Sequence, residues 1–101
     1  MEIKAYCINL NIHYTAPDEI WDKLGELYTK MPGWNEEICE WYGYDGKRIY
    51  VSVEPSGLQF CAQLPVKEWE AWILEFKKKA TEIMGYEIGE PEDGFEFHYY
   101  E

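Results

Sequence analysis

Residues 64–86 have the sequence LPVKEWEAWILEFKKKATEIMGY, and this stretch predicts a long amphipathic helix. Its apolar side chains recur at helical spacing, which places them on one stripe of the helix surface. The stripe consists of Trp69, Ile73, Phe76, Ala80 and Ile83. Pro65 suits the start of a helix, and Gly85 suits a left-handed helix end. Such a stripe must be buried, so we expect the rest of the chain to supply a sheet that covers it.

The N-terminal third of the chain predicts a strand followed by a second helix. Residues 3–14 alternate between apolar side chains and small or polar ones, which is typical of a strand with one buried face. Thr15 and Pro17 then form a helix-start signal, in which we expect Thr15 to cap the helix. Apolar residues follow at helical spacing until Pro32 and Gly33 end the element.

The middle of the chain predicts three strands joined by tight turns. Residues 34–44 favour a strand with an irregular pattern, and Tyr44-Asp45-Gly46-Lys47 is a strong hairpin signal. Residues 48–54 form the return strand, and the turn at residues 55–57 leads into a further strand over residues 58–64. After the long helix, residues 86–88 and 95–100 predict two more short strands.

The predicted order is therefore β-α-β-β-β-α-β-β within a single α+β domain over residues 1–101. We expect a two-layer sandwich, with a mainly antiparallel sheet of five or six strands and both helices on one face. A chain of 101 residues that is 47% hydrophobic can bury one core. In that core we expect the long helix to contact Ile8, Leu10, Ile12, Val51, Phe60 and the strand that carries Phe95 and Phe97.

Three cysteines are an odd number without metal-type spacing: Cys7, Cys39 and Cys61. This pattern favours reduced thiols. Met1 leads directly into the first strand pattern, with no secretory signal peptide. Both observations predict a cytoplasmic protein.

No diagnostic motif for catalysis, metal binding or cofactor binding is present. Cys7 and His13 share a strand face, but six residues of strand separate them by about 20 Å, too far for a nucleophile and its base. The chain lacks zinc-type, EF-hand and phosphate-loop spacings. We therefore expect no catalytic, metal-ligating or cofactor-binding residues, and the sequence favours a binding protein over an enzyme.

The net charge of −11 restricts the class of partner. Residues 87–101 contain six acidic side chains and no lysine or arginine. Such a field repels nucleic acid and anionic membranes, and no apolar run approaches the length of a membrane span. We expect a basic protein as the partner, with no role for nucleic acid or membrane.

A mixed acidic and aromatic segment is the candidate site for that partner. It contains Trp34, Glu36, Glu37, Glu40, Trp41 and Tyr44. We expect Trp41 and Tyr44 to stack on arginine side chains of the partner while carboxylates accept their hydrogen bonds. This role requires Trp41 to be exposed. The alternative is that both tryptophans are ordinary core residues.

Three functional hypotheses follow from these patterns. The first is a small acidic protein-binding module, for example an immunity or inhibitor protein that neutralises a basic partner such as a nuclease toxin. The second is a small-ligand-binding domain, or an enzyme, with an aromatic pocket between the sheet and the helices. The third is a homo-oligomer that assembles through the open sheet face, which is otherwise simply solvated. That face is predicted to carry Asn9, Asn11, His13, Arg48, Tyr50, Ser52, Glu54, Gln59, Gln63, Glu96, His98 and Tyr100.

Overall fold

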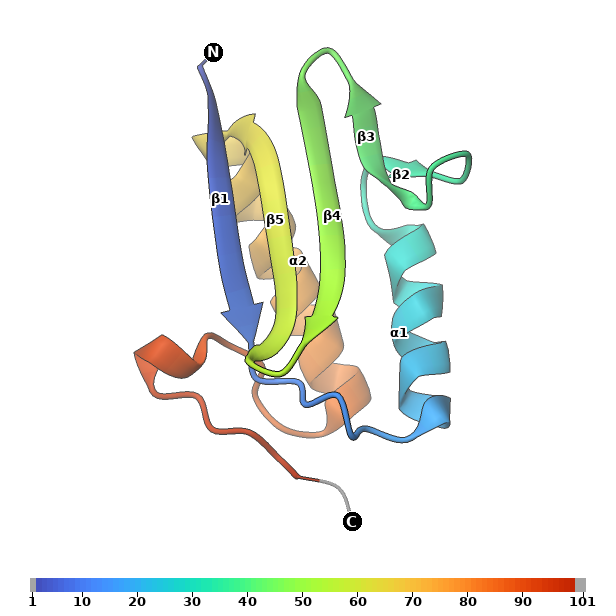
Figure 1. The fold of residues 1–101 in the computed structure, drawn as a ribbon, viewed down its shortest axis with the longest axis vertical. Coiled ribbons are helices and arrows are strands. Elements are labelled where there is room, and N and C mark those ends of the chain that lie inside the picture. The colour runs from blue at the N-terminus through green and yellow to red at the C-terminus, as the bar shows by residue number, and fades with distance from the viewer. Residues whose placement is uncertain (1, 100–101) are drawn as a thin grey trace.

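The computed structural model describes residues 2–99 and confirms a two-layer α+β fold (Figure 1). One sheet is antiparallel throughout and has the strand order β1-β5-β4-β3-β2. Both helices lie on one side of it. The elements in chain order are β1 (Ile3–Leu10), α1 (Asp18–Lys30), β2 (Trp34–Asn35), β3 (Glu40–Tyr44), β4 (Lys47–Glu54), β5 (Gly57–Pro65), α2 (Val66–Met84) and the short 3-10 helix η1 (Pro91–Asp93).

Helix α2 begins and ends where the sequence predicts. Pro65 occupies the N-cap, and Gly85 ends the helix in the left-handed conformation with φ 81°. The predicted stripe is buried at Trp69, Ile73 and Phe76, and Trp72 widens it. The stripe packs on β5, because the rings of Phe60 and Phe76 lie 4.6 Å apart. Of the predicted sheet partners Leu10, Ile12 and Phe60 are buried, and Ile8 and Val51 are partly buried.

Helix α1 forms as predicted, but its predicted cap is wrong. Pro17 occupies the N-cap position and no side chain caps the helix. The Thr15 hydroxyl instead lies 2.6 Å from Nδ1 of His13. This local bond engages the hydroxyl that would otherwise cap the helix. Threonine hydroxyls often form such local bonds in turns. Asp18 and Glu19 in the first turn still complement the positive end of the helix dipole.

The hairpin between β3 and β4 is confirmed, whereas the long strand predicted before it is wrong. Asp45 and Gly46 both have positive φ angles, 53° and 77°, as a type I′ turn requires. Residues 34–44 form two short strands instead of one, because the chain reverses direction within them. Cys39 adopts a left-handed φ of 54° just before β3. Trp41 then pairs back with Trp34 of β2.

The two strands predicted after α2 do not form within the described residues, and Tyr100 lies outside them. The segment that follows α2 instead crosses the end of the sheet below β1 (Figure 1). Asn11 ties it there: its side-chain amide donates to the carbonyls of Glu87 and Glu96, and its Oδ1 accepts from the amide of Gly89. Phe95 and Phe97 are partly exposed and lie outside the main core, contrary to the prediction.

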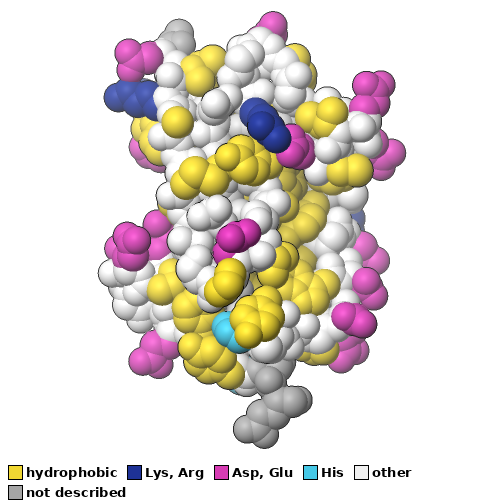
Figure 2. Space-filling model, in the orientation of Figure 1, with side chains coloured by type: hydrophobic (Ala, Val, Ile, Leu, Met, Phe, Trp, Pro, Cys, Tyr) yellow, Lys and Arg dark blue, Asp and Glu magenta, His cyan; other side chains and the backbone are white. Residues whose placement is uncertain are grey.

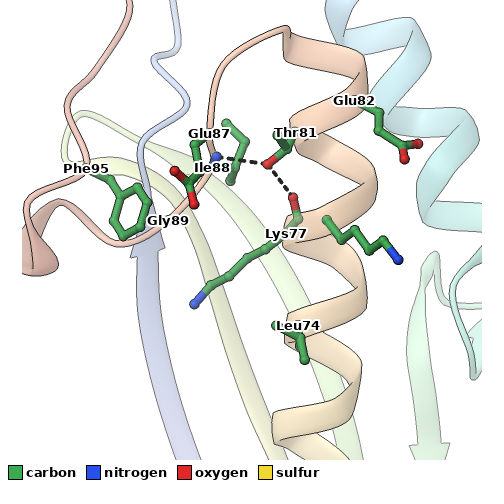
Figure 3. A pocket seen from close by; sticks show the side chains of 9 residues that line it. Leu74, Lys77, Thr81, Glu82, Glu87, Ile88, Gly89 and Phe95 are labelled. Carbon is green, nitrogen blue, oxygen red and sulfur yellow. Dashed lines mark hydrogen bonds between the residues drawn. The ribbon is translucent and has the colours of Figure 1, made fainter.

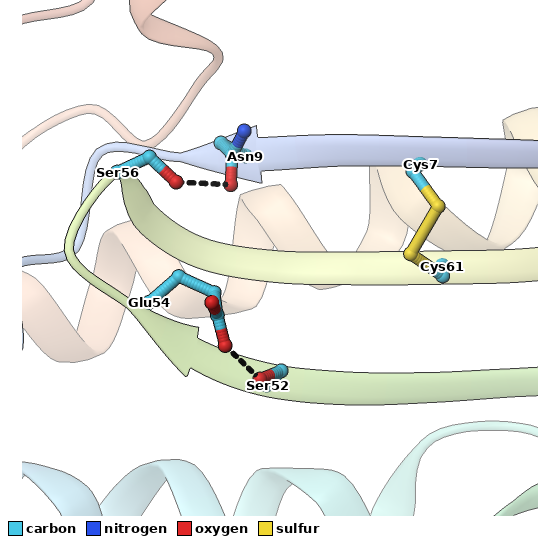
Figure 4. The surroundings of a disulfide bond; sticks show 6 residues. All are labelled: Cys7, Asn9, Ser52, Glu54, Ser56 and Cys61. Carbon is cyan, nitrogen blue, oxygen red and sulfur yellow. Dashed lines mark hydrogen bonds between the residues drawn. A yellow bond between two sulfur atoms is a disulfide. The ribbon is translucent and has the colours of Figure 1, made fainter.

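The prediction of reduced thiols is wrong for two of the three cysteines. Cys7 and Cys61 face each other across β1 and β5 and form a disulfide, with their Cα atoms 4.1 Å apart (Figure 4). Cys39 is free and exposed. The disulfide removes the redox argument for a cytoplasmic location. Within residues 2–99, neither helix combines the length and the apolar character that crossing a membrane requires.

Candidate partner-binding surface

Trp41 cannot take the role predicted for it, because it is a core residue. Its exposed fraction is 0%, and its indole N–H donates to the carbonyl of Tyr28 on α1 at 2.9 Å. Its ring packs edge-on against Trp34, at a centroid distance of 5.4 Å. Trp34 is itself half-buried. The prediction that Trp41 stacks on an arginine of a partner is therefore wrong, and the alternative of a core residue holds for it.

Glu40 already binds an arginine of its own chain. Nε and Nη2 of Arg48 on the neighbouring strand donate to its two carboxylate oxygens, each at 2.8 Å. These bonds lower the pKa of the Glu40 carboxyl, because they favour its charged form. The guanidinium also lies 4.3 Å from the ring centroid of Tyr50. The sequence thus indicated the right chemistry, with carboxylate and aromatic ring around a cation, but the cation is internal.

The exposed residues of the predicted site are Glu36 and Glu37, in the loop between β2 and β3, and Tyr44, at the far end of β3. Together with Ile38 of that loop and the half-buried Tyr42 of β3, we call them the hairpin patch. Ile38 is 45% exposed and Tyr44 is 57% exposed, and the rings of Tyr42 and Tyr44 lie 6.1 Å apart.

Gly43 explains how Ile38 reaches that surface. A Cβ at Gly43 would lie 2.5 Å from Cδ1 of Ile38, so the Ile38 side chain packs on β3 at the place where glycine has no side chain. Ile38 was not predicted as a site residue, because its exposure depends on this contact. The sequence contains one signal for this role: Ile38 is an apolar side chain that follows Glu36 and Glu37 and precedes a strand with a glycine.

The surrounding surface is acidic because most of the few lysine and arginine side chains form ion pairs with acidic residues. Five of the nine lysine and arginine side chains form ion pairs within the described residues, and Glu36 and Glu37 of the hairpin patch have none there. Figure 2 shows acidic side chains along both margins of the open sheet face and basic ones at few points. The pairs are Lys4–Glu2, Lys47–Glu68, Arg48–Glu40, Lys77–Glu90 and Lys79–Glu75.

The space between sheet and helices, where the ligand-binding hypothesis expects a pocket, is filled by aromatic rings. Phe60 lies 5.7 Å from Trp72 and 6.0 Å from Trp41, measured between ring centroids. An open groove of about 680 Å³ lies elsewhere, between α2 and the segment after it (Figure 3). Its residues are Leu74, Lys77, Lys78, Thr81, Glu82, Glu87, Ile88, Gly89 and Phe95.

Two polar side chains of this groove, Thr81 and Lys77, are engaged in bonds to the protein itself. The Thr81 hydroxyl donates to the carbonyl of Lys77 at 2.7 Å and accepts the amide of Ile88 at 3.0 Å. Lys77 pairs with Glu90. These bonds fasten the segment after α2 to the helix. Within residues 2–99, no group of three histidine, cysteine or acidic side chains is arranged to hold a metal ion.

The open sheet face carries part of the set predicted for it. Asn9, Arg48, Tyr50, Gln59 and Gln63 lie on β1, β4 and β5 at the alternate positions that face away from the helices. Ser52 and Glu54 share those positions and hydrogen-bond to each other. Asn11 is buried instead of open, with an exposed fraction of 1%. His13, Glu96 and His98 lie off the sheet, and Tyr100 is outside the described residues.

No protein-family model matches the chain. No curated protein and no solved structure is significantly similar to it. A function can therefore be inferred only from the residues of this chain.

Proposed function

We propose that this protein is an acidic protein-binding module that captures a basic protein. The observation that carries the proposal is the hairpin patch, which combines the exposed side chains of Ile38 and Tyr44 with the carboxylates of Glu36 and Glu37, which form no ion pair within residues 2–99. Protein interfaces combine an apolar, tyrosine-rich centre with a polar rim. The patch has both parts, distributed over the loop between β2 and β3 and over β3 itself.

The charge of the whole molecule supports the same class of partner. A net charge of −11 on a domain of this size attracts a cationic surface over a distance and accelerates association at low salt. Enzymes that act on nucleic acid carry such cationic surfaces, because they must bind phosphates. An inhibitor or immunity protein for a nuclease toxin is the specific form that we propose.

A pair of charge-reversal variants tests the proposal. Glu36→Lys/Glu37→Lys alters the hairpin patch, and Glu70→Lys/Glu92→Lys changes two exposed carboxylates elsewhere by the same total charge. Each protein is immobilised, and basic proteins bound at low salt are identified and their association rates measured. We expect the patch variant to lose a partner that wild type and the control variant retain. Equal loss in both variants would show that general charge, and not the patch, captures the partner.

A smaller substitution separates the apolar part of the patch from its charge. Tyr44→Ala leaves the net charge unchanged and removes the most exposed ring of the patch. We expect it to raise the dissociation rate of the captured protein while the association rate stays near the wild-type value. An unchanged dissociation rate would remove Tyr44 from the interface.

A further inference from the structure

Strand β4 lacks a neighbouring strand on one of its two sides over half of its length. β3 pairs with β4 only from Tyr44 to Trp41, which faces Ile49. The chain then turns away at Cys39, so residues 50–54 of β4 have β5 on one side and no strand on the other (Figure 1). In an uninterrupted antiparallel ladder, residues 39 and 37 would face Val51 and Val53.

The register shows which backbone groups this edge presents. Cys7 and Cys61 have Cα atoms 4.1 Å apart, which identifies a pair without mutual backbone hydrogen bonds. The N–H and C=O of Cys61 therefore point to β4, where they meet Tyr50. Hydrogen-bonding direction alternates along a strand, so the N–H and C=O of Val51 and Val53 point away from β5. Two donors and two acceptors consequently lie along the open edge.

Over residues 50–54 this edge lacks three features that commonly guard sheet edges: lysine, proline and a bulge. Residues 50–54, YVSVE, contain neither lysine nor proline. The β4–β5 register over these residues has no irregularity. Val53 is 52% exposed although its side chain points to the helix side. A regular row of backbone groups beside exposed apolar surface is the feature that strand-adding domains present.

Charge selects the kind of segment that fits. Glu54 lies at one end of the open edge, and the loop with Glu36 and Glu37 joins the sheet where β3 begins. A second copy of this chain would bring another net charge of −11 to the same place. We infer that the open edge of β4 binds an extended, lysine- or arginine-rich segment of the partner as an added strand. This inference rests on the proposed function, since it specifies the form of the basic partner.

Amide hydrogen exchange can test the inference residue by residue. The probe is the synthetic peptide acetyl-KVKVKVK-amide, and the control is the same peptide with a methyl group on every backbone nitrogen. In the protein alone we expect Tyr50 and Ser52 to exchange slowly and Val51 and Val53 to exchange rapidly. Saturation with the probe should slow exchange at Val51 and Val53 by tenfold or more. The methylated peptide keeps charge and side chains but lacks the amide donors, so it should bind roughly tenfold more weakly.

A protein variant provides the reciprocal test. Val53→Pro removes one outward amide and spares the bonds to β5, and Val53→Thr keeps that amide as a matched control. Slow exchange at Tyr50 verifies that each variant is folded. We expect the proline variant to bind the probe about tenfold more weakly than the threonine variant.

Several results would overturn strand addition and leave the proposed function intact. Equal binding of both peptides would mean capture by charge alone. Protection of Val51 and Val53 that rises with protein concentration, without peptide, would assign the edge to a second copy. Absence of any probe-induced protection would remove the edge as a binding site. Partner capture by the variant Glu36→Lys/Glu37→Lys is measured separately, without the peptide, and tests the proposed function whatever exchange Val51 and Val53 show.

Discussion

Asn11 is the residue on which the position of the C-terminal segment depends most. Besides the three bonds of its side chain, its backbone amide donates to Gly89, and its carbonyl accepts the hydroxyl of Tyr86. Asn11→Ala would leave two carbonyls and one amide without partners. We expect it to lower the free energy of unfolding by about 2–4 kcal/mol and to accelerate exchange of the Gly89 amide.

Asn9→Ala is the matched control for this substitution. Asn9 lies on the open face of the same strand, and its side chain accepts one exposed bond, from Ser56 (Figure 4). We expect a loss of less than about 1 kcal/mol in chemical denaturation. A similar loss for both variants would contradict the special role of Asn11.

The prediction that Asn11 lies on the open sheet face is wrong because the strand ends one residue before it. Alternation put Asn9 and Asn11 on one face, and this holds for Asn9. The strand ends at Leu10, and beyond it the backbone no longer alternates. Ile12 is buried as predicted, whereas Asn11 turns into the molecule and becomes the only buried polar residue within residues 2–99. Its four partners lie more than seventy positions away in the sequence, so no local pattern indicates them.

Among the elements, α2 contributes most to the core through Phe76. This ring is 0% exposed and packs against Phe60 and Trp72. We expect Phe76→Ala to cost about 3–5 kcal/mol in the free energy of unfolding, measured by urea denaturation. Leu74→Ala on the same helix changes a side chain that is 69% exposed and should cost less than about 1 kcal/mol. A cost below 1 kcal/mol for Phe76→Ala would contradict its place in the core.

The Cys7–Cys61 disulfide, which joins β1 to β5, makes a second testable contribution to the stability of the fold. It closes a loop with a sequence separation of 54 residues. By the chain-entropy relation, a loop of this size stabilises the fold by about 4 kcal/mol. The double variant Cys7→Ser/Cys61→Ser should lose that amount, whereas Cys39→Ser should change stability little. Mass spectrometry after alkylation should show one modified cysteine before reduction and three after it.

Elements with strong local signals could be predicted, and those that depend on distant pairing could not. Both helices and the Asp45-Gly46 turn follow from propensity, spacing and φ preference over a few residues. Residues 95–100 also alternate, but a strand needs a neighbouring edge. The adjacent edge of β1 ends before it can pair with them, and Asn11 supplies the bonds instead. The reversal at Cys39 shortened β3 in the same non-local way.

For the molecule as a whole, unpaired acid is the dominant electrostatic feature. Twenty acidic and nine basic side chains repel the compact state, and salt screens that repulsion. Between about 10 mM and 150 mM sodium chloride, we expect the midpoint of thermal unfolding to rise by roughly 4 °C, which corresponds to about 1 kcal/mol. The variant Glu70→Lys/Glu92→Lys should show a smaller rise. A midpoint that falls with salt would mean that the ion pairs outweigh the repulsion.

The same scale explains how much of the candidate site was predictable. Net charge is a sum over the sequence, so the acidic character and the basic class of partner could be inferred without a structure. Which aromatic side chains remain exposed is a property of packing. Trp41 and Tyr44 have similar sequence surroundings, yet one is completely buried and the other is 57% exposed. The open edge of β4 depends on where β3 begins, which only the tertiary structure defines.

The disulfide also determines how the protein responds to a pulling force. The N-terminal strand begins at one end of the long axis and the last described residues lie at the other, so a force applied through the two ends pulls along that axis (Figure 1). The link between Cys7 and Cys61, whose sequence separation is 54, withholds residues 8–60 from extension. At about 3.6 Å per extended residue, the oxidised chain stretches roughly 190 Å less than the reduced one. Under tension, the covalent state of one cysteine pair therefore sets the reach of the whole chain.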